Sequence, residues 1–194
     1  MNLNEFAKEI HANACDKGFW DEPRPFDELC ALMISELAEA LEEARAGRPM
    51  EWYKRMPGCH PNCADERIDE CEEAGGCYFG FGALKPEGIA VEMADCAIRI
   101  LDYLGSVEYE LEEFDDFDDP VDISTAFMRV VSEIVKARIY HKNYFGVSLE
   151  NAMLENALHH ILSWFEGNGL DFEDIARRKH EYNKTRERLH GKLF

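Results

Sequence analysis

The sequence predicts an all-α fold with an irregular insert, contained in a single domain that spans residues 1–194. Apolar residues recur three and four positions apart in six segments, which is the spacing of amphipathic helices. Proline and glycine mark the ends of these segments. A chain of 194 residues with 46% hydrophobic residues can bury one sizeable core and is too short for two typical domains.

Capping residues define the ends of the predicted helices. Pro25 and Pro86 occupy first helical positions, where the missing N–H has no helical partner to lose. Ser124 and Ser148 are predicted N-caps, and Gly47 ends the second helix. On this basis the six helices are predicted to cover residues 3–17, 25–47, 86–104, 124–142, 148–166 and 170–190.

Three connecting segments lack a helical period. Residues 19–25 hold two prolines and an aromatic pair, which predicts a short loop. Residues 48–85 follow neither a helical nor a strand period and form the irregular insert. Residues 108–119 are strongly acidic and are predicted to form a short helix and a solvated turn that Pro120 closes.

Acidic residues outnumber basic residues by 40 to 21, which gives a formal net charge of −19. No Lys/Arg cluster stands out, so we expect no binding of nucleic acid through a basic surface. A polyanionic ligand would be repelled by this charge and would need metal ions to accompany it. Residues 1–18 lack the apolar segment of a signal peptide, and no stretch is long enough to span a membrane. We therefore expect a cytoplasmic protein.

Two predicted helices each carry two acidic residues three positions apart, namely Glu36 with Glu39 and Glu92 with Asp95. Residues at this spacing project from one side of a helix, so two such helices side by side would bring four carboxylates together. Crowded carboxylates need a cation between them, and all-oxygen ligands suit Mg²⁺ or Mn²⁺. The alternative is that these acids lie on solvated helix faces. The helix at 89–104 disfavours that alternative, because it is largely apolar. Its narrow polar strip consists of Glu92, Asp95, Arg99 and Asp102.

These acidic segments resemble those of the MazG-like all-α nucleoside triphosphate pyrophosphohydrolases, whose relatives include the dimeric dUTPases and the dCTP pyrophosphatases. The resemblance is specific around residues 29–47 and 86–104 and absent between 48 and 85. It implies a four-helix bundle in which water attacks the α-phosphate of a nucleotide and pyrophosphate is released. It also implies four acids that hold Mg²⁺, namely Glu36, Glu39, Glu92 and Asp95.

The same resemblance implies substrate contacts. In the dCTP pyrophosphatases a His nine residues before a Trp helps to hold the base, and His11 and Trp20 stand at that spacing. Lys179, Asn183 and Arg186 are four and three residues apart, and they look like the Lys-x₃-Asn-x₂-Arg element that contacts the triphosphate. The alternatives are core packing for the first two residues and an exposed basic helix end for the last three.

The insert carries five residues that could bind zinc, namely Cys59, His60, Cys63, Cys71 and Cys77. Their spacing is irregular, but four thiols, or three thiols with the histidine, can bind Zn²⁺ tetrahedrally. The alternative is an exposed loop with incidental thiols. Cys30 and Cys96 lie within apolar helical patterns, where free thiols commonly pack.

Short matches between the two halves of the chain indicate a degenerate internal duplication. Residues 35–40 match residues 132–137 at an offset of 97, and residues 100–103 match residues 161–164 at an offset of 61. The offsets differ by 36 residues, which is close to the length of the insert. A single insertion in the first half therefore accounts for the difference.

The second half, residues 120–194, has lost most of the acids carried by the first half, residues 1–114. The corresponding positions hold Lys136, Met153 and Asn156, and only Glu133 keeps an acid. The second half would complete the four-helix bundle that simpler family members build by dimerising, which gives one active site per chain. A homodimer stays open, although such an internal pseudo-dimer makes a monomer sufficient.

The sequence thus predicts a Mg²⁺-dependent enzyme that converts a nucleoside triphosphate, ribo or deoxy, to the monophosphate and pyrophosphate in nucleotide-pool housekeeping. Glu39 is favoured as the carboxylate that accepts the proton of water, and the base and the sugar stay open. The alternative is a catalytically silent relative that binds a nucleotide or a protein partner.

If the insert binds zinc, protein purified without chelator should contain nearly one zinc ion per chain by elemental analysis. Cys63→Ser and Cys71→Ser should both lose that metal, because each variant removes one thiolate from a tetrahedral site. Zinc-free wild-type protein would instead support the alternative of incidental thiols.

Overall fold

Helix α4 (Ile89–Ser106) is the central element of the structure, a computed structural model that describes residues 1–54, 85–114, 121–142 and 149–191. Thirteen of its 18 residues are buried, which confirms the expectation from its apolar composition. The helices that contact it are α1 (Leu3–Asp16), α2 (Phe26–Arg45), α6 (Leu149–Gly167) and α7 (Phe172–Thr185). The described residues also form α5 (Ile123–Lys142), a 3₁₀ turn at Arg188–Gly191, and the strands β1 (Trp52–Lys54) and β2 (Lys85–Glu87).

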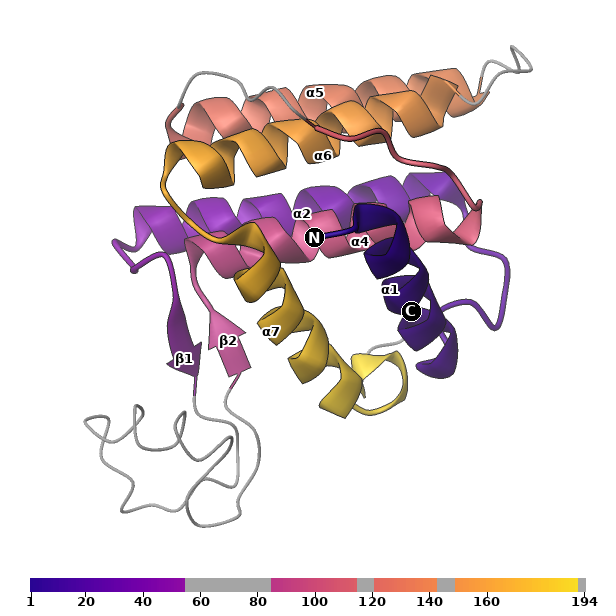
Figure 1. Cartoon of the computed structure of the whole chain (residues 1–194), viewed down its shortest axis with the longest axis horizontal. Helices are drawn as coiled ribbons and strands as arrows, with labels where there is room; N and C mark the ends of the chain where they lie inside the picture. Colours follow the sequence, from indigo (N-terminus) through magenta and orange to yellow (C-terminus); the bar gives the residue numbers. More distant parts are fainter. Residues whose placement is uncertain (55–84, 115–120, 143–148, 192–194) are drawn as a thin grey trace.

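The helices form two stacked pairs with two further helices across them (Figure 1). Helix α2 packs beside α4, α5 packs beside α6, and contacts of α2 with α5 and of α4 with α6 join the pairs. Helices α1 and α7 cross α4 on the side away from α5 and α6. The structure is mostly helical, so the predicted all-α fold is confirmed. The internal duplication stays a prediction, although α5 and α6 do pack on α2 and α4 as it would require.

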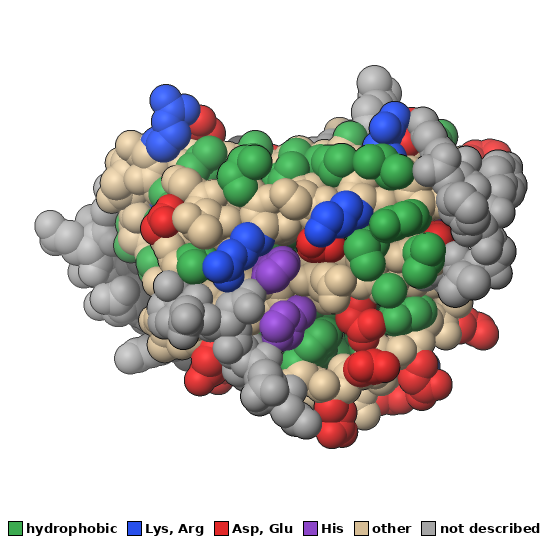
Figure 2. All heavy atoms as spheres, turned by 90° about the horizontal axis from the view of Figure 1, so that it is seen from above, with side chains coloured by type: hydrophobic (Ala, Val, Ile, Leu, Met, Phe, Trp, Pro, Cys, Tyr) green, Lys and Arg blue, Asp and Glu red, His purple; other side chains and the backbone are tan. Residues whose placement is uncertain are grey.

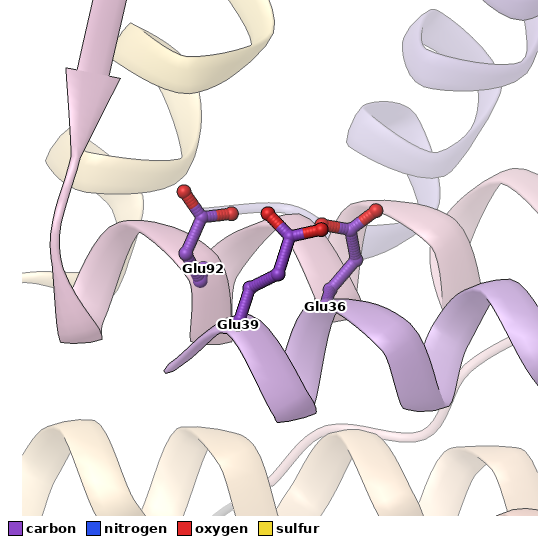
Figure 3. A group of neighbouring side chains, drawn as sticks. All are labelled: Glu36, Glu39 and Glu92. Atoms are coloured by element: carbon purple, nitrogen blue, oxygen red, sulfur yellow. The ribbon is translucent and has the colours of Figure 1, made fainter. Parts of the chain in front are cut away.

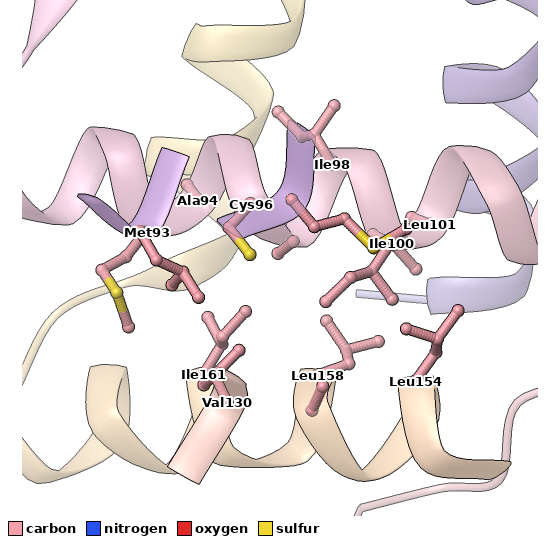
Figure 4. Packing of buried hydrophobic residues seen from close by; sticks show 14 of the residues in the cluster. Met93, Ala94, Cys96, Ile98, Ile100, Leu101, Val130, Leu154, Leu158 and Ile161 are labelled. Carbon is pink, nitrogen blue, oxygen red and sulfur yellow. The ribbon is translucent and has the colours of Figure 1, made fainter. Parts of the chain in front are cut away.

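The core lies between the two helix pairs (Figure 4). Ile100 of α4 points toward Leu154 and Leu158 of α6, and Val130 of α5 lies near Ile161 of α6; all five side chains are fully buried. Burial of this apolar face is the main favourable contribution to folding. It also orients α4, because the polar strip on the opposite side of the helix must then face α1 and α7.

A two-stranded antiparallel hairpin closes the insert at its base, and the sequence did not predict it. Trp52 of β1 pairs with Glu87 of β2, and Tyr53 pairs with Pro86. Strands of three residues are too short to show an alternating pattern, which explains the omission. The prediction that Pro86 starts the third helix was wrong, because α4 begins at Ile89, after the strand.

Glycine is required at the junction between β2 and α4. Gly88 has a φ of 118°, and a Cβ atom there would lie 2.6 Å from the carbonyl oxygen of Met50. That carbonyl accepts a hydrogen bond from the N–H of Ala90 at 2.9 Å. The first turn of α4 is thus fastened to the chain just before β1.

Helix α5 begins at a different cap from the predicted Ser124. The Oδ1 atom of Asp122 accepts hydrogen bonds from the N–H groups of Ser124 and Thr125 at 2.9 and 3.1 Å, so Asp122 is the N-cap. The apolar spacing within this helix predicts a buried stripe that includes Val130, Ile134 and Val135; this was wrong for Val135, which is 41% exposed. Figure 2 shows the face above α5 and α6, where hydrophobic side chains reach the surface; Met128 of α5 is 58% exposed. The predicted cap Ser148 lies outside the described residues.

The acidic segment after α4 does not form the predicted short helix over its described part, which ends at Phe114. The side chain of Asn4 donates to the carbonyl of Leu111 at 3.1 Å and accepts from its N–H at 2.8 Å. These two bonds replace the helical hydrogen bonds of Leu111, whose side chain is buried. The remainder of the segment, residues 115–120, lies outside the described residues.

The last helix is shorter than predicted. Helix α7 ends at Thr185, and Arg186 has extended backbone angles, with φ at −75° and ψ at 154°. The ammonium of Lys17 donates to the carbonyl oxygens of Lys184 and Arg186 at 2.6 and 2.5 Å. A cation from the end of α1 therefore satisfies carbonyl groups at the C-terminal end of α7.

Among the described helices, we find none that combines the length and the apolar character needed to cross a membrane.

The contact between the two helix pairs should dominate stability. Leu158→Ala should lower the free energy of unfolding by about 2–5 kcal/mol, because it leaves a cavity beneath α4. Val135→Ala, at a largely exposed position of α5, should change it by less than about 0.5 kcal/mol. Urea denaturation measures both values, and equal effects of the two substitutions would contradict this packing.

Candidate metal centre

Helices α2 and α4 bring three glutamates together (Figure 3). Glu36 and Glu39 lie one turn apart on α2, and Glu92 projects from the first turn of α4. One carboxylate oxygen of each lies within 4.8 Å of the other two. Glu36 and Glu92 are buried, at 4% and 2% exposure, whereas Glu39 is exposed. Carboxylates this close repel one another strongly where water is excluded.

Asp95 lies one turn beyond Glu92 on α4 and is held by α7. Its Oδ2 atom lies 3.3 Å from the ammonium of Lys179, and its Oδ1 atom accepts a hydrogen bond of 3.3 Å from the side-chain amide of Asn183. The Lys179 ammonium also lies 3.5 Å from a carboxylate oxygen of Glu92. The structure therefore brings the four predicted acids together with two of the three residues predicted to contact the triphosphate.

The third residue of that predicted element is placed differently. Arg186 follows the end of α7, so it does not share a helical face with Lys179 and Asn183. It lines a pocket of about 60 Å³ between α1, α4 and α7, together with Asp95 and Asn183. Two more arginines, Arg24 and Arg99, line the same pocket, so a small anion would meet positive charge there.

The cluster carries more negative than positive charge. Arg99 donates from Nε to the Oε1 atom of Glu36 at 2.6 Å, and Lys179 lies between Glu92 and Asp95. With all four carboxylates ionised, these two cations leave two negative charges in excess. That excess equals the charge of one divalent cation, and an all-oxygen ligand set of this kind fits Mg²⁺ or Mn²⁺.

The pKa values follow from burial and from these contacts. Burial, only partly offset by Lys179, raises the pKa of Glu92 to about 9. Burial and the neighbouring charge of Asp95 also raise the pKa of Glu36. Burial alone would raise the pKa of Asp95, but Lys179 and Arg99 outweigh it and leave this pKa below its usual value. Without a bound cation, Glu92 therefore keeps its proton at neutral pH, whereas Asp95 is ionised.

His11 and Trp20 lie together at the other end of the polar strip of α4. Both contact Asp102: the Nδ1 atom of His11 lies 2.8 Å from Oδ1, and the indole N–H of Trp20 donates to the same oxygen at 2.9 Å. Their rings meet edge to face, with centroids 5.1 Å apart. They line a separate pocket of about 410 Å³ with Phe26 and Tyr103. The base-holding role stays a prediction.

A further pocket of about 740 Å³ lies away from the acids, between the start of α1 and the start of α7. Acidic residues on its lining are Glu112, Glu113, Glu166, Asp171 and Glu173. These charges would repel a polyphosphate. The volume of this pocket therefore does not make it a candidate for binding such a ligand.

Sequence reasoning placed Arg99 and Asp102 on the narrow polar strip of α4 but gave neither of them a role. The sequence did contain a signal for both residues, because their spacing places them on the same side of a buried helix as Glu92 and Asp95. Arg178 was missed entirely. It donates to the hydroxyl of Tyr53 at 2.6 Å and pairs with Glu51 at 2.5 Å, which fastens the hairpin to α7.

The predicted zinc ligands of the insert, Cys59, His60, Cys63, Cys71 and Cys77, lie outside the described residues. Cys30 and Cys96 are buried free thiols, as predicted. Fold and site together describe an all-α protein with a buried carboxylate cluster between two helices. Comparisons of the chain with protein-family models, with curated proteins and with solved structures find no match.

In the absence of metal, Glu92 should make the protein less stable as the pH rises from about 4.5 to about 9. The unfolded chain releases this proton near pH 4.5, whereas the folded chain keeps it until about pH 9, so the unfolded state binds fewer protons within this window. Urea titrations in EDTA across this range measure the slope. Glu92→Gln should reduce it, and an unchanged slope in the variant would contradict the shifted pKa.

Proposed function

We propose that this protein is a Mg²⁺-dependent nucleoside triphosphate pyrophosphohydrolase of the MazG-like type, with Mn²⁺ as an alternative metal. The observation that carries the proposal is the convergence of Glu36, Glu39 and Glu92, of which one carboxylate oxygen each lies within 4.8 Å of the other two. Buried carboxylates in excess destabilise a fold unless a cation joins them. Such a cluster is therefore better explained by metal binding than by stability.

The reaction consumes one water molecule. The water oxygen forms a bond to the α-phosphorus, the bond from that phosphorus to the oxygen bridging to the β-phosphate breaks, and pyrophosphate leaves. A Mg²⁺ ion held by the cluster would supply Lewis-acid chemistry, by polarising the α-phosphate and lowering the pKa of the attacking water. Glu36, Glu39 and Glu92 would hold the ion, with Asp95 beside them.

Glu39 is the best placed of the four acids to accept the proton of water. Arg99 occupies an oxygen of Glu36, and Lys179 lies against Glu92 and Asp95. Glu39 is exposed, so it can reach the attacking water and pass the proton on to solvent.

Cations along α4 and α7 would bind the phosphates. Arg99, Lys179 and Arg186 lie beside the acids and can offset the charge that develops on the leaving pyrophosphate. Asn183 can donate a hydrogen bond from the same side.

The nucleoside end would extend along α4 toward His11 and Trp20. Their anchor Asp102 lies ten residues beyond Glu92, which corresponds to about 15 Å along a helix. The metal cluster and the aromatic pair would thus bind opposite ends of one extended nucleotide.

A screen of the common ribo- and deoxynucleoside triphosphates tests the proposal, with Mg²⁺ present and pyrophosphate release as the readout. Glu39→Gln and Asp95→Asn should each lower kcat by about 100-fold or more, since one removes the proton acceptor and the other removes the anchor of Lys179. Circular dichroism should show that both variants keep the helical fold.

Glu42→Gln is the matched control, because Glu42 is an exposed acid of α2 whose partner is the exposed Arg45. Its kcat should stay at the wild-type value. Wild-type kcat in Glu39→Gln or Asp95→Asn would refute the assignment of these acids. Absence of turnover with every nucleotide would favour the silent nucleotide-binding alternative.

A further inference from the structure

The hairpin lies beside the carboxylate cluster, because its second strand leads directly into α4. Figure 3 shows β2 next to Glu92, on the side to which the three labelled carboxylates point. Glu87 of β2 makes the contact: the carboxyl group of Glu92 donates a hydrogen bond to its carboxylate, which also attracts Lys179. The hairpin is therefore part of the wall of the site.

One face of the hairpin is directed at the cluster and carries two lysines. Lys54 of β1 pairs directly with Lys85 of β2, which stands two residues before Glu87. Side chains two residues apart on a strand share a face, and so do side chains directly opposite each other on neighbouring strands. Both lysines therefore lie on the face of Glu87, whereas Tyr53, whose hydroxyl accepts a hydrogen bond from α7, lies on the other face.

Like charges directly opposite each other destabilise a pair of strands, so the pairing of Lys54 with Lys85 needs an explanation. Glu87 binds only one of them: its Oε1 atom lies 2.7 Å from the ammonium of Lys85, whose side chain is 24% exposed. An ammonium has three N–H donors, so Lys85 keeps two for a further anion. Lys54 is exposed, and within the described residues no carboxylate pairs with it. An anion bound between the two lysines would remove their repulsion.

The order of groups along α4 gives the direction of the bound nucleotide. In the proposed function, the aromatic pair at Asp102 takes the nucleoside and the cluster at Glu92 takes the α-phosphate. The β- and γ-phosphates of an extended nucleotide then lie on the far side of the cluster from the nucleoside. Helix α4 begins only three residues before Glu92, so the next groups in that direction belong to the hairpin. The positive end of the helix dipole lies at the same place.

The cations assigned so far do not cover this end of the site. Arg99 and Arg186 line the small pocket on the nucleoside side of the cluster, and Lys179 lies level with the acids. Pyrophosphate that extends past the acids would therefore meet the two hairpin lysines.

We propose that Lys54 and Lys85 bind the β- and γ-phosphates of the substrate and hold the pyrophosphate as it leaves. Glu87 positions Lys85 for this contact. The inference rests on the proposed function for the reaction, but the binding of pyrophosphate can be measured without turnover.

Calorimetric titration of the full chain with inorganic pyrophosphate, in the presence of Mg²⁺, tests the inference. Lys85→Met should weaken the binding of pyrophosphate by about tenfold or more, because it removes a charge-assisted hydrogen bond. Lys54→Met should weaken it by about threefold, since this lysine is exposed and no carboxylate of the described residues holds it in place. Lys85→Arg keeps the charge and should bind pyrophosphate within about threefold of wild type.

Lys8→Met is the matched control, because Lys8 is an exposed lysine of α1 that pairs with Glu5. It should bind pyrophosphate as wild type does. The common nucleoside monophosphates, titrated in the same way, probe the other end of the site. Their affinity should change by less than about twofold in Lys85→Met, because a single phosphate at the cluster does not reach the hairpin.

A merely structural role of Lys85 in fastening the hairpin would give a different result. Lys85→Met would then lower the midpoint of urea unfolding and weaken pyrophosphate and the monophosphates alike, which would overturn the inference. Lys54→Met serves as the second test, because it removes a like charge from an exposed position and should not lower that midpoint.

Pyrophosphate affinity within about twofold of wild type in Lys85→Met would also overturn the inference, as would wild-type protein that binds no pyrophosphate. These results are distinct from failure of the proposed function. A chain that binds pyrophosphate through the two lysines but hydrolyses no nucleotide would refute the enzyme proposal alone. A chain that hydrolyses a nucleotide, with unchanged pyrophosphate affinity in both lysine variants, would refute the role of the hairpin alone.

Discussion

Buried negative charge on α4 is the constraint on which the rest of the structure depends. The helix is mostly enclosed by apolar side chains, yet it carries Glu92 and Asp95 in its interior. Groups on the polar side balance part of the charge of the cluster: α7 supplies Lys179 and Asn183, and Arg99 of α4 pairs with Glu36 of α2. Loss of one partner from such a buried pair costs about 3–5 kcal/mol, so the packing of these helices and the balance of their charges cannot be separated.

The position of α7 is therefore as important as the acids themselves. Among the contacts that hold it in place, Arg178 binds Tyr53 and Glu51 at the base of the insert, and Lys17 binds the carbonyl groups at its end. The first contact links the hairpin to the residue next to Lys179. A change at the base of the insert can thus reach the carboxylate cluster through one residue of α7.

Much of the site could be predicted because helical spacing is local. Glu92 and Asp95 are three residues apart, and this places them on one side of any helix. The same reasoning was wrong for Arg186, because α7 ends at Thr185. Beyond that point Lys17 binds the backbone carbonyl of Arg186, and the turn at Arg188–Gly191 follows. It also gave no role to Asp102, whose partners His11 and Trp20 are about 90 and 80 residues away in sequence.

The sequence by itself determined the helices, their apolar faces and the pairing of acids along two of them, since these depend on periodicity and capping within a few residues. Tertiary structure alone decided that Lys179 lies against Asp95, that Asp122 and not Ser124 caps α5, and that residues before α4 form a strand. Each of these depends on a contact or a competition that the local pattern does not encode. The charge of the cluster is the clearest case, because the acids can be counted in the sequence but one of their two counter-charges, Lys179, comes from a helix 87 residues beyond Glu92.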